Sequence, residues 1–439
     1  MVPTLKYFIS YCVKHIRFAE QLRIVSHLTR MGINKDQNLT YQKKKLVNVL
    51  KTAALNIKYY SNLRDLDLDN LKYSDIEKIP VLTKDIIRTQ GEQLLNKHLD
   101  APKAYKNTSG GSTGEPIIVY RTKEQDDHGQ ANYYFSTILN GANIYDFSVD
   151  LWGAKRDMHK SLKPNNFKSL LFNKVLLNTF VMNEKIIQSY IEYLNKARPH
   201  FIKAYVHSIY EIAKYINQKG LSMCFSPIVH CTTGPLYPEM KAEIEKAFNG
   251  AVVYNFYGSR EVSAIATSVG GNGDSLHTLY DNVFLEILDS ENNQVALGEE
   301  GEIAITTLNN MYMPLIRYKI GDRAVKGDTL SFGTLTLQKV LGRTLGVIHT
   351  ADGRKIDGQF FTTLFFNKKG IKSFQLVQKA ILDLELSIIK DHNFSMSILN
   401  EILECIKVEL PRVNISLQFV ESIQLSTTGK IMYVYSELP

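Results

Sequence analysis

The sequence contains only four cysteines in 439 residues, and their placement does not suggest a disulfide framework or a structural metal. Neither close pairing nor the two-residue spacing of a zinc clamp occurs among Cys12, Cys224, Cys231 and Cys405. Long apolar runs are also absent, since none approaches the roughly 18 residues of a membrane span. The N-terminus lacks the basic, apolar and small-residue order of a secretory signal. These absences favour a protein of the reducing cytoplasm.

An evenly spread excess of positive charge is lacking as well, although 52 Lys and Arg against 44 Asp and Glu give a net charge of +8. Residues 1–50 hold nine basic and two acidic residues and carry +7, so residues 51–439 carry only about +1. Nucleic-acid binding needs basic and aromatic residues interleaved on one face, which a near-neutral body does not supply. We therefore expect no nucleic-acid partner.

The basic arm over residues 1–40 begins with a helical pattern. Basic residues separate apolar residues that recur at helical spacing, namely Leu5, Phe8, Ile9, Cys12, Val13 and Ile16. The pattern predicts an amphipathic helix. Two interpretations stay open, a helix that docks on its own domain and a helix that binds a membrane surface or a partner.

The length and the 44% content of hydrophobic residues indicate a globular protein of two domains. From about residue 103 to 260, short apolar runs alternate with helical patterns, which predicts a mostly parallel sheet covered by helices. Buried strands are expected at 228–231 and 252–256, and helices at 184–196 and 207–218. Beyond residue 280 the period approaches two, which predicts a smaller antiparallel section with strands at 283–288, 302–307, 329–332 and 335–340.

A compact α+β unit of about a hundred residues is expected after residue 341. Its pattern predicts helices near 358–367 and 395–409 and strands near 372–378, 381–389 and 414–420. The predicted fold class is therefore α/β. The large domain would span residues 1–341 and the small domain residues 342–439.

A segment rich in glycine and hydroxyl groups lies between two apolar elements. It comprises Thr108, Ser109, Gly110, Gly111, Ser112, Thr113 and Gly114. The glycines let successive N–H groups converge and the hydroxyls add donors, so the loop can wrap a phosphate. It is not a Walker A loop, because Glu115 stands where that motif needs lysine. A flexible surface loop is the alternative interpretation.

Four further segments carry groups that suit a nucleotide. At the end of a predicted strand, rings, hydroxyls and a carboxylate follow one another in Tyr254, Asn255, Phe256, Tyr257, Gly258, Ser259 and Glu261. A buried strand end with a solvated ion pair is the alternative there. Asp322 stands behind a glycine turn at a strand end, where an acid accepts hydrogen bonds from a ribose diol or caps the turn. Arg343 follows a glycine, and Lys430 lies in a turn near the C-terminus.

In their order and spacing these five segments resemble the adenylate-forming acyl ligase superfamily. More narrowly, they resemble its phenylacetate-CoA ligase branch with the CapK-like members of capsule biosynthesis, and Tyr59, Tyr60 and residues 79–85 extend that resemblance towards the N-terminus. It implies ATP- and Mg²⁺-dependent activation of a small carboxylic acid as an acyl-adenylate, with release of pyrophosphate. The acyl group would then pass to CoA or to an amine such as an amino sugar. A catalytically inactive scaffold in a polysaccharide-assembly complex is the alternative.

The resemblance implies how the phosphates would be held. Residues 109–114, beside Thr108, would bind the β- and γ-phosphates of ATP, and Ser259 would touch the α-phosphate. Glu261 would bind Mg²⁺. Lys430, on a mobile C-terminal domain, would reach the α-phosphate and the carboxylate oxygens.

The resemblance also implies where the rest of the nucleotide and the acid would lie. Residues 254–257 and the turn at Gly234 would flank the adenine, and Asp322 with Arg343 would hold the ribose hydroxyls. The wall of the acid pocket would be formed by Trp152, Gly153, Tyr205 and His207.

Two departures from the family pattern change the expectations. At the domain hinge, Thr344, Leu345 and Gly346 follow Arg343 where relatives carry acidic residues, although the free torsions of glycine still permit a hinge. Ser268 stands near where related chains often show a cysteine, so no structural zinc is expected.

Overall fold

The computed structural model describes the chain except for residues 1, 33, 100–103, 109–116, 153–166, 180–181, 271–274, 330–333, 344–346, 353–354, 366–367, 424–431 and 439. Residues 109–114, Gly153, residues 344–346 and Lys430 lie outside the described residues, so what the sequence predicts for them remains a prediction. In the part of the chain that is described, no helix has the length and apolar character needed to cross a membrane.

The predicted N-terminal helix is α1 (Val2–Arg17), and it contacts its own body. The ring of Tyr11 lies 5.0 Å from that of Tyr145, and the Nζ of Lys14 donates to the carbonyl of Ile144. The contact does not use the whole apolar set, because Phe8 is 62% exposed. Ile16 is 84% exposed, so an apolar strip of α1 faces solvent.

The helices α2 (Ala19–Met31) and α3 (Lys35–Asn56) follow α1 and connect it to the rest of the molecule. The carboxylate of Asp281 is fully buried and accepts from Lys45 at 2.6 Å and from Asn132 at 2.7 Å. The Nδ1 of His128 also lies 2.7 Å from it. One buried carboxylate therefore ties α3 to the helix that carries His128 and Asn132. Short helical elements follow α3, namely η1 (Lys58–Asp65), α4 (Tyr73–Ile76), α5 (Lys84–Gln90) and η2 (Gly91–Leu94).

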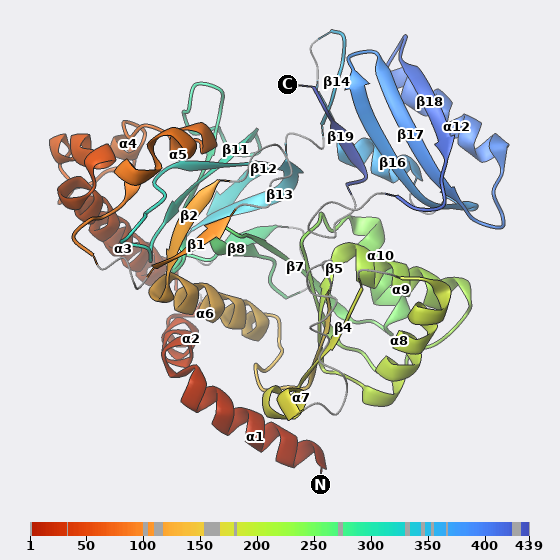
Figure 1. The fold of residues 1–439 in the computed structure, drawn as a ribbon, viewed down its shortest axis with the longest axis horizontal. Coiled ribbons are helices and arrows are strands. Elements are labelled where there is room, and N and C mark those ends of the chain that lie inside the picture. The colour runs from red at the N-terminus through yellow and green to blue at the C-terminus, as the bar shows by residue number, and fades with distance from the viewer. Residues whose placement is uncertain are drawn as a thin grey trace.

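The predicted parallel sheet covered by helices is present (Figure 1). Its strands are β3 (Ser148–Leu151), β4 (Lys174–Leu177), β5 (Phe201–Tyr205), β6 (Ile228–Thr232) and β7 (Val252–Ser259). The helices of this part are α6 (Lys123–Leu139), α7 (Phe167–Phe172), α8 (Glu184–Ala197), α9 (Val206–Gln218) and α10 (Pro238–Ala247). Buried residues of α8, α9 and α10 pack with Leu151, Ile202 and Val229 in one apolar core. Alternate strand residues point the other way, towards α6.

The antiparallel section continues the same sheet. Its strands are β8 (Ser263–Thr267), β9 (Leu276–Thr278), β10 (Val283–Leu288), β11 (Glu300–Thr307), β12 (Tyr318–Thr329) and β13 (Leu335–Arg343). The 11 strands have the order β10-β11-β12-β13-β9-β8-β7-β6-β5-β3-β4. The first part of β7 pairs with β6 in parallel and its last part pairs with β8 antiparallel, so β7 joins the two halves.

One detail of the predicted antiparallel section is wrong. A glycine turn was expected to end a strand before Asp322, but β12 runs without a break from Tyr318 to Thr329. Gly321 takes φ +90 inside the strand, a conformation that glycine adopts without strain. The expected strand at 329–332 falls mostly outside the described residues.

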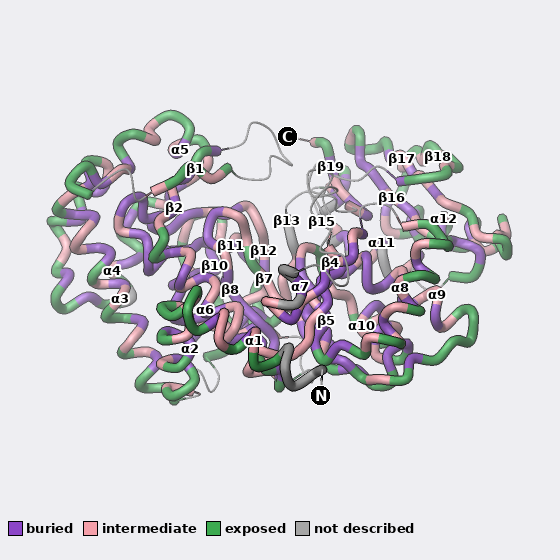
Figure 2. The backbone as a smooth tube through the Cα atoms, turned by 60° about the horizontal axis from the view of Figure 1, so that its bottom comes forward, coloured by how far each residue is buried: buried purple, intermediate pink, exposed green. Residues whose placement is uncertain are grey.

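The C-terminal residues form a separate pair of sheets with two helices, as the α+β pattern predicted. The elements are β14 (Val347–His349), β15 (Lys355–Asp357), α11 (Gly358–Phe365), β16 (Ile371–Ala380), β17 (Asp383–Lys390), α12 (Met396–Glu409), β18 (Asn414–Phe419) and β19 (Val434–Ser436). The larger sheet has the order β18-β17-β16-β19. Figure 2 shows buried residues along the strands of both the central and the C-terminal sheets. A hydrogen bond of 2.9 Å from Lys214 of α9 to the carbonyl of Lys372 joins the two parts.

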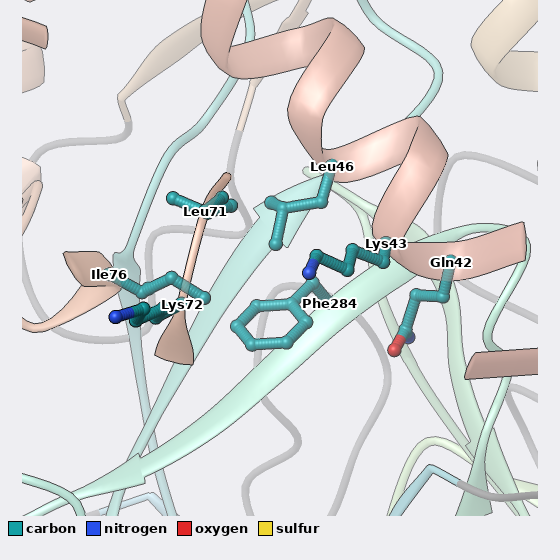
Figure 3. A pocket seen from close by; sticks show the side chains of 7 residues that line it. All are labelled: Gln42, Lys43, Leu46, Leu71, Lys72, Ile76 and Phe284. Carbon is teal, nitrogen blue, oxygen red and sulfur yellow. The ribbon is translucent and has the colours of Figure 1, made fainter. Parts of the chain in front are cut away.

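A small pocket lies between α3 and the edge strand β10 (Figure 3). Its lining residues are Gln42, Lys43, Leu46, Leu71, Lys72, Ile76 and Phe284. Six strand spacings of about 4.8 Å, or about 29 Å, separate β10 from β7. The pocket is therefore remote from the segment over residues 254–261, while β12 with Asp322 lies two strands from β10.

Candidate active site

The segment over residues 254–261 begins in the parallel half of the sheet and ends in the turn between β7 and β8. At Gly258 a Cβ would stand 2.5 Å from the carbonyl oxygen of Ser263, so the bulge at this point accepts only glycine. The Oγ of Ser259 accepts from the N–H of Val262 at 3.2 Å, which closes the turn around Glu261. Glu261 itself is 4% exposed.

The hairpin of β1 (Ala104–Thr108) and β2 (Ile118–Thr122) holds this turn. The carbonyl of Arg260 accepts from the Nδ2 of Asn107 at 2.6 Å and from Arg121 at 2.9 Å. The carbonyl of Glu261 accepts from Gln125 of α6 at 3.3 Å. Because Asn107 and Thr108 lead directly into residues 109–114, the β7–β8 turn lies beside the start of that loop.

Asp322 is brought to the same place from the antiparallel half. The hydroxyl of Tyr257 donates to its Oδ2 at 2.6 Å. Arg343 on β13 is the backbone partner of Asp322. Four of the five segments, namely those of Thr108, Tyr257, Asp322 and Arg343, are thus neighbours in the fold.

Lys84 also reaches this place, which the sequence did not indicate. A Cβ on Gly321 would lie 3.0 Å from its Nζ, so the ammonium lies beside β12 next to Asp322. The backbone of Leu82 fixes this position, since its N–H donates to the carbonyl of Arg317 at 3.1 Å. In the sequence, Lys84 belongs to residues 79–85, which extend the family resemblance, but no spacing rule connects it with Asp322.

The residues expected around the acid lie at the carboxyl end of the parallel strands. The ring of Trp152 packs on that of Tyr205 with centroids 4.1 Å apart. Gly234, expected beside the adenine, is exposed just after β6. His207 has a different contact, because its Nδ1 lies 2.9 Å from the hydroxyl of Tyr433 in the C-terminal unit. Burial lowers the pKa of His207, so the imidazole is neutral at pH 7.

A row of polar side chains crosses the parallel strands beneath α6, and sequence reasoning missed it. Asp150, Lys203, His230 and Tyr254 are register partners on β3, β5, β6 and β7. The ring of Tyr133 on α6 covers the row, 4.5 Å from the Nζ of Lys203 and 5.1 Å from the ring of His230. The only signal in the sequence is a polar residue at the middle of each apolar strand, which does not reveal that the strands are neighbours.

Burial perturbs the titration of this row. It lowers the pKa of Lys203 to about 8, although the charge of Asp150 acts in the opposite direction. Burial, with the nearby charge of Lys203, also lowers the pKa of His230 well below its usual range. Tyr254 is fully buried, and its hydroxyl lies 2.8 Å from the Nδ1 of His230, so its side chain belongs to the row.

The fold is that of the adenylate-forming ligases. A structure of 2-hydroxyisobutyryl-CoA ligase in the postadenylation state matches with a TM-score of 0.69 and 16% identity, over 90% of this chain and 89% of that one. The amide bond synthetase McbA from Marinactinospora thermotolerans matches with a TM-score of 0.52 and 12% identity, over 75% of this chain and 67% of that one.

The sequence comparisons point to one kind of protein with this fold, CapK. Residues 348–437 match the family model of the CapK C-terminal domain. Protein CapK of Staphylococcus aureus is 23% identical over 419 residues, which cover 87% of this chain and 86% of that protein. The resemblance to the CapK-like adenylate-forming ligases is therefore confirmed.

In this CapK-like chain, the C-terminal unit and the rest of the molecule are arranged more as in the postadenylation state of 2-hydroxyisobutyryl-CoA ligase than as in its thioesterification state. The TM-score of 0.69 against the postadenylation state of 2-hydroxyisobutyryl-CoA ligase falls to 0.57 against the thioesterification state of the same enzyme. Because both structures are of the same enzyme, the difference between the two TM-scores reflects how the parts of that enzyme are arranged in each state. The contact between His207 and Tyr433 belongs to the arrangement seen in this structure.

Proposed function

We propose that the chain is an ATP- and Mg²⁺-dependent acid ligase that forms an acyl-adenylate and releases pyrophosphate. The observation that supports this most is the gathering of four separate segments around the β7–β8 turn, where Tyr257 bonds to Asp322 at 2.6 Å and Arg260 bonds to Asn107. These contacts join residues that are about 65 to 150 positions apart in the sequence. The similar structures of 2-hydroxyisobutyryl-CoA ligase hold an acyl-AMP, in one case together with CoA, which agrees with the proposal.

In the proposed reaction, the carboxylate of the acid attacks the α-phosphate of ATP. Two anions must approach, so the site has to supply donors and positive charge aimed at the reacting phosphorus. Ser259 would donate to the α-phosphate and Lys430 would neutralise the charge shared by the acid and the nucleotide. Asp322, oriented by Tyr257, would hold the ribose. No general base is required, because the acid is already ionised at pH 7.

Glu261 is the residue proposed to hold Mg²⁺. The turn around it is fixed by Gln125 and Arg121, which leaves one carboxylate in a rigid, nearly enclosed position. Across the described residues, no cluster of three His, Cys, Asp or Glu side chains occurs. A single carboxylate suits Mg²⁺, which takes its other ligands from phosphates and water. When bound, the ion neutralises phosphate charge.

The second step is proposed to transfer the acyl group to CoA or to an amine. We propose a domain boundary at residues 341–342, with residues 344–346 as the hinge and a C-terminal domain that delivers Lys430 and then moves away. The contact of Tyr433 with His207 supports such delivery, because Tyr433 follows Lys430 by three residues and His207 follows the end of β5. The screen described below compares CoA and amino sugars as acceptors.

A pyrophosphate-release screen tests the proposal. Purified protein is given ATP, Mg²⁺ and a panel of carboxylic acids, with and without CoA or amino sugars. We expect release that requires both ATP and one class of acid, and Lys430→Ala should lose most of that rate. Full activity of Lys430→Ala would contradict the role of that lysine. Failure to bind ATP in calorimetry with Mg²⁺ would favour the inactive scaffold instead.

We also propose a peripheral contact through the N-terminal helix. Phe8 and Ile16 are exposed on α1, within a stretch of the chain that carries +7, and such a helix suits an anionic membrane surface. Sedimentation with anionic vesicles should fall for Phe8→Ser and Ile16→Ser. Deleting residues 1–40 is a poorer test, because Ile24, Val25 and Leu28 are buried. Equal binding by the wild type and both variants would rule out this contact.

A further inference from the structure

The polar row lies just below the edge of the sheet where the acid is expected. Lys203 precedes the end of β5 by two residues, and His230 precedes the end of β6 by two. At about 3.3 Å per residue, the row is about 7 Å from that edge. The edge itself carries the rings of Trp152 and Tyr205, which contact each other at an interplanar angle of 49°. A molecule that enters between these rings and α6 would reach Lys203 first.

The row contains one positive charge that is not matched. Asp150 is paired with Lys174 through a contact of 2.6 Å, so its charge is largely satisfied. The charge of Asp150 also acts on Lys203, but among the described residues the ammonium of Lys203 has no salt bridge or hydrogen bond. It faces the rings of Tyr133 at 4.5 Å and Trp152 at 4.9 Å. Such ring contacts offset only part of the cost of holding a charge away from water without a partner.

The Nε2 of His230 is a second polar atom of the row that lacks a partner among the described residues. The imidazole of His230 is fully buried. In the tautomer in which the hydroxyl of Tyr254 donates to Nδ1, Nε2 carries a hydrogen and is a donor. Buried donors are normally satisfied, so an unsatisfied one beside an unmatched cation indicates a missing acceptor.

We propose, on the basis of the acid-activating function proposed above, that the acid carries a second negatively charged group and that Lys203 and His230 bind it. One carboxylate of the acid would react at the nucleotide, and the second would pair with Lys203 and accept from the Nε2 of His230. The second group would match the surplus charge of the row. The rings of Tyr133 and Trp152 would then enclose the chain between the two groups.

The test compares acids that differ only in the second group. Pyrophosphate release is measured with dicarboxylic acids of two to six carbons and with monocarboxylic acids of the same lengths. We expect one dicarboxylic acid to exceed its monocarboxylic counterpart in kcat/KM by at least tenfold. Lys203→Met should lower that value about 10- to 100-fold, as for a lost hydrogen bond to a charged group. It should leave the KM for ATP and the activity with the monocarboxylic acid unchanged.

Two controls keep the outcomes distinct. Lys196→Met removes an exposed lysine of α8 and should change nothing, and Lys203→Arg should keep the preference for the dicarboxylic acid. Equal loss with both kinds of acid in Lys203→Met would make Lys203 merely structural and overturn the inference. A wild-type preference for monocarboxylic acids would overturn it while leaving the proposed function intact. No release with any acid would overturn both.

Discussion

The contact between Tyr433 and His207 should control how often the C-terminal unit is docked. Tyr433→Phe removes only the hydroxyl, which lies 2.9 Å from the Nδ1 of His207. The ring stays, so its packing on Phe374 at 5.4 Å is retained. The variant therefore isolates one hydrogen bond between the two parts of the molecule.

The expected size of the effect of Tyr433→Phe on docking follows from the burial of this contact. Tyr433 is 9% exposed, and burial already lowers the pKa of His207, so docking without the hydroxyl leaves a polar atom without a partner. Such a loss costs about 1 to 3 kcal/mol. At about 1.4 kcal/mol for each factor of ten, the ratio of docked to undocked molecules should fall by about 5- to 150-fold. The rate of pyrophosphate release should fall once the undocked form dominates.

Fluorescence energy transfer measures this ratio directly. Cys224 on the body and Cys405 on α12 are both exposed and can carry the dyes after Cys12→Ser, while Cys231 is buried. Tyr435→Phe, two residues further along the chain in β19, is the matched control, because Tyr435 is half-buried and has no hydrogen bond to α9 among the described residues. If single-molecule transfer distributions of Tyr433→Phe and Tyr435→Phe both equal that of the wild type, the hydrogen bond does not hold the units together.

Three further changes test other parts of the structure. Tyr257→Phe should raise the KM for ATP about tenfold or more, because it removes a 2.6 Å hydrogen bond to the Asp322 carboxylate; a KM within twofold of the wild type in initial-rate assays would argue against a ribose role. Glu286→Gln should lower the free energy of unfolding by about 3 to 5 kcal/mol in urea, since it leaves the guanidinium of Arg317, 1% exposed, without its partner at 3.1 Å. Glu300→Gln, in a more exposed pair with Arg323, should cost at most about 1 kcal/mol, and equal effects would contradict the argument. Because burial lowers the pKa of His230 and His207 below 6.5, the unfolded chain binds protons that the folded chain does not, so stability should be full above pH 6.5 and fall towards pH 5. A flat profile of urea midpoints between pH 7.5 and 5 would refute this.

The fold was largely predictable because its patterns are local. The strand expected at 283–288 is β10, and the helix expected at 207–218 is α9 with one more residue at its start. Apolar period and flanking turn residues decide such elements. Asp322 was misplaced for the opposite reason. Whether Gly321 ends a strand or continues it with a positive φ depends on β11 and β13, which lie on either side.

The site was predictable only where a motif exists. The segment ending in Glu261 and the pair of Asp322 and Arg343 were recognised from their residue types, and they are neighbours in the fold. The polar row was not, because Lys203 and His230 are single polar residues in separate apolar strands and only the lateral register brings them together. Tyr433 was missed because its partner lies 226 positions away.

The double pairing of β7 has a consequence for how the proposed acid specificity could change. Within four residues this strand contributes Tyr254 to the polar row and Tyr257 to the Asp322 contact. A mutation in β7 would therefore disturb both proposed binding regions together, whereas β5, which carries Lys203, is separated from β7 by β6. Evolution towards a new acid is expected to proceed through β5 while β7 stays unchanged. Directed libraries for altered acid specificity should randomise β5.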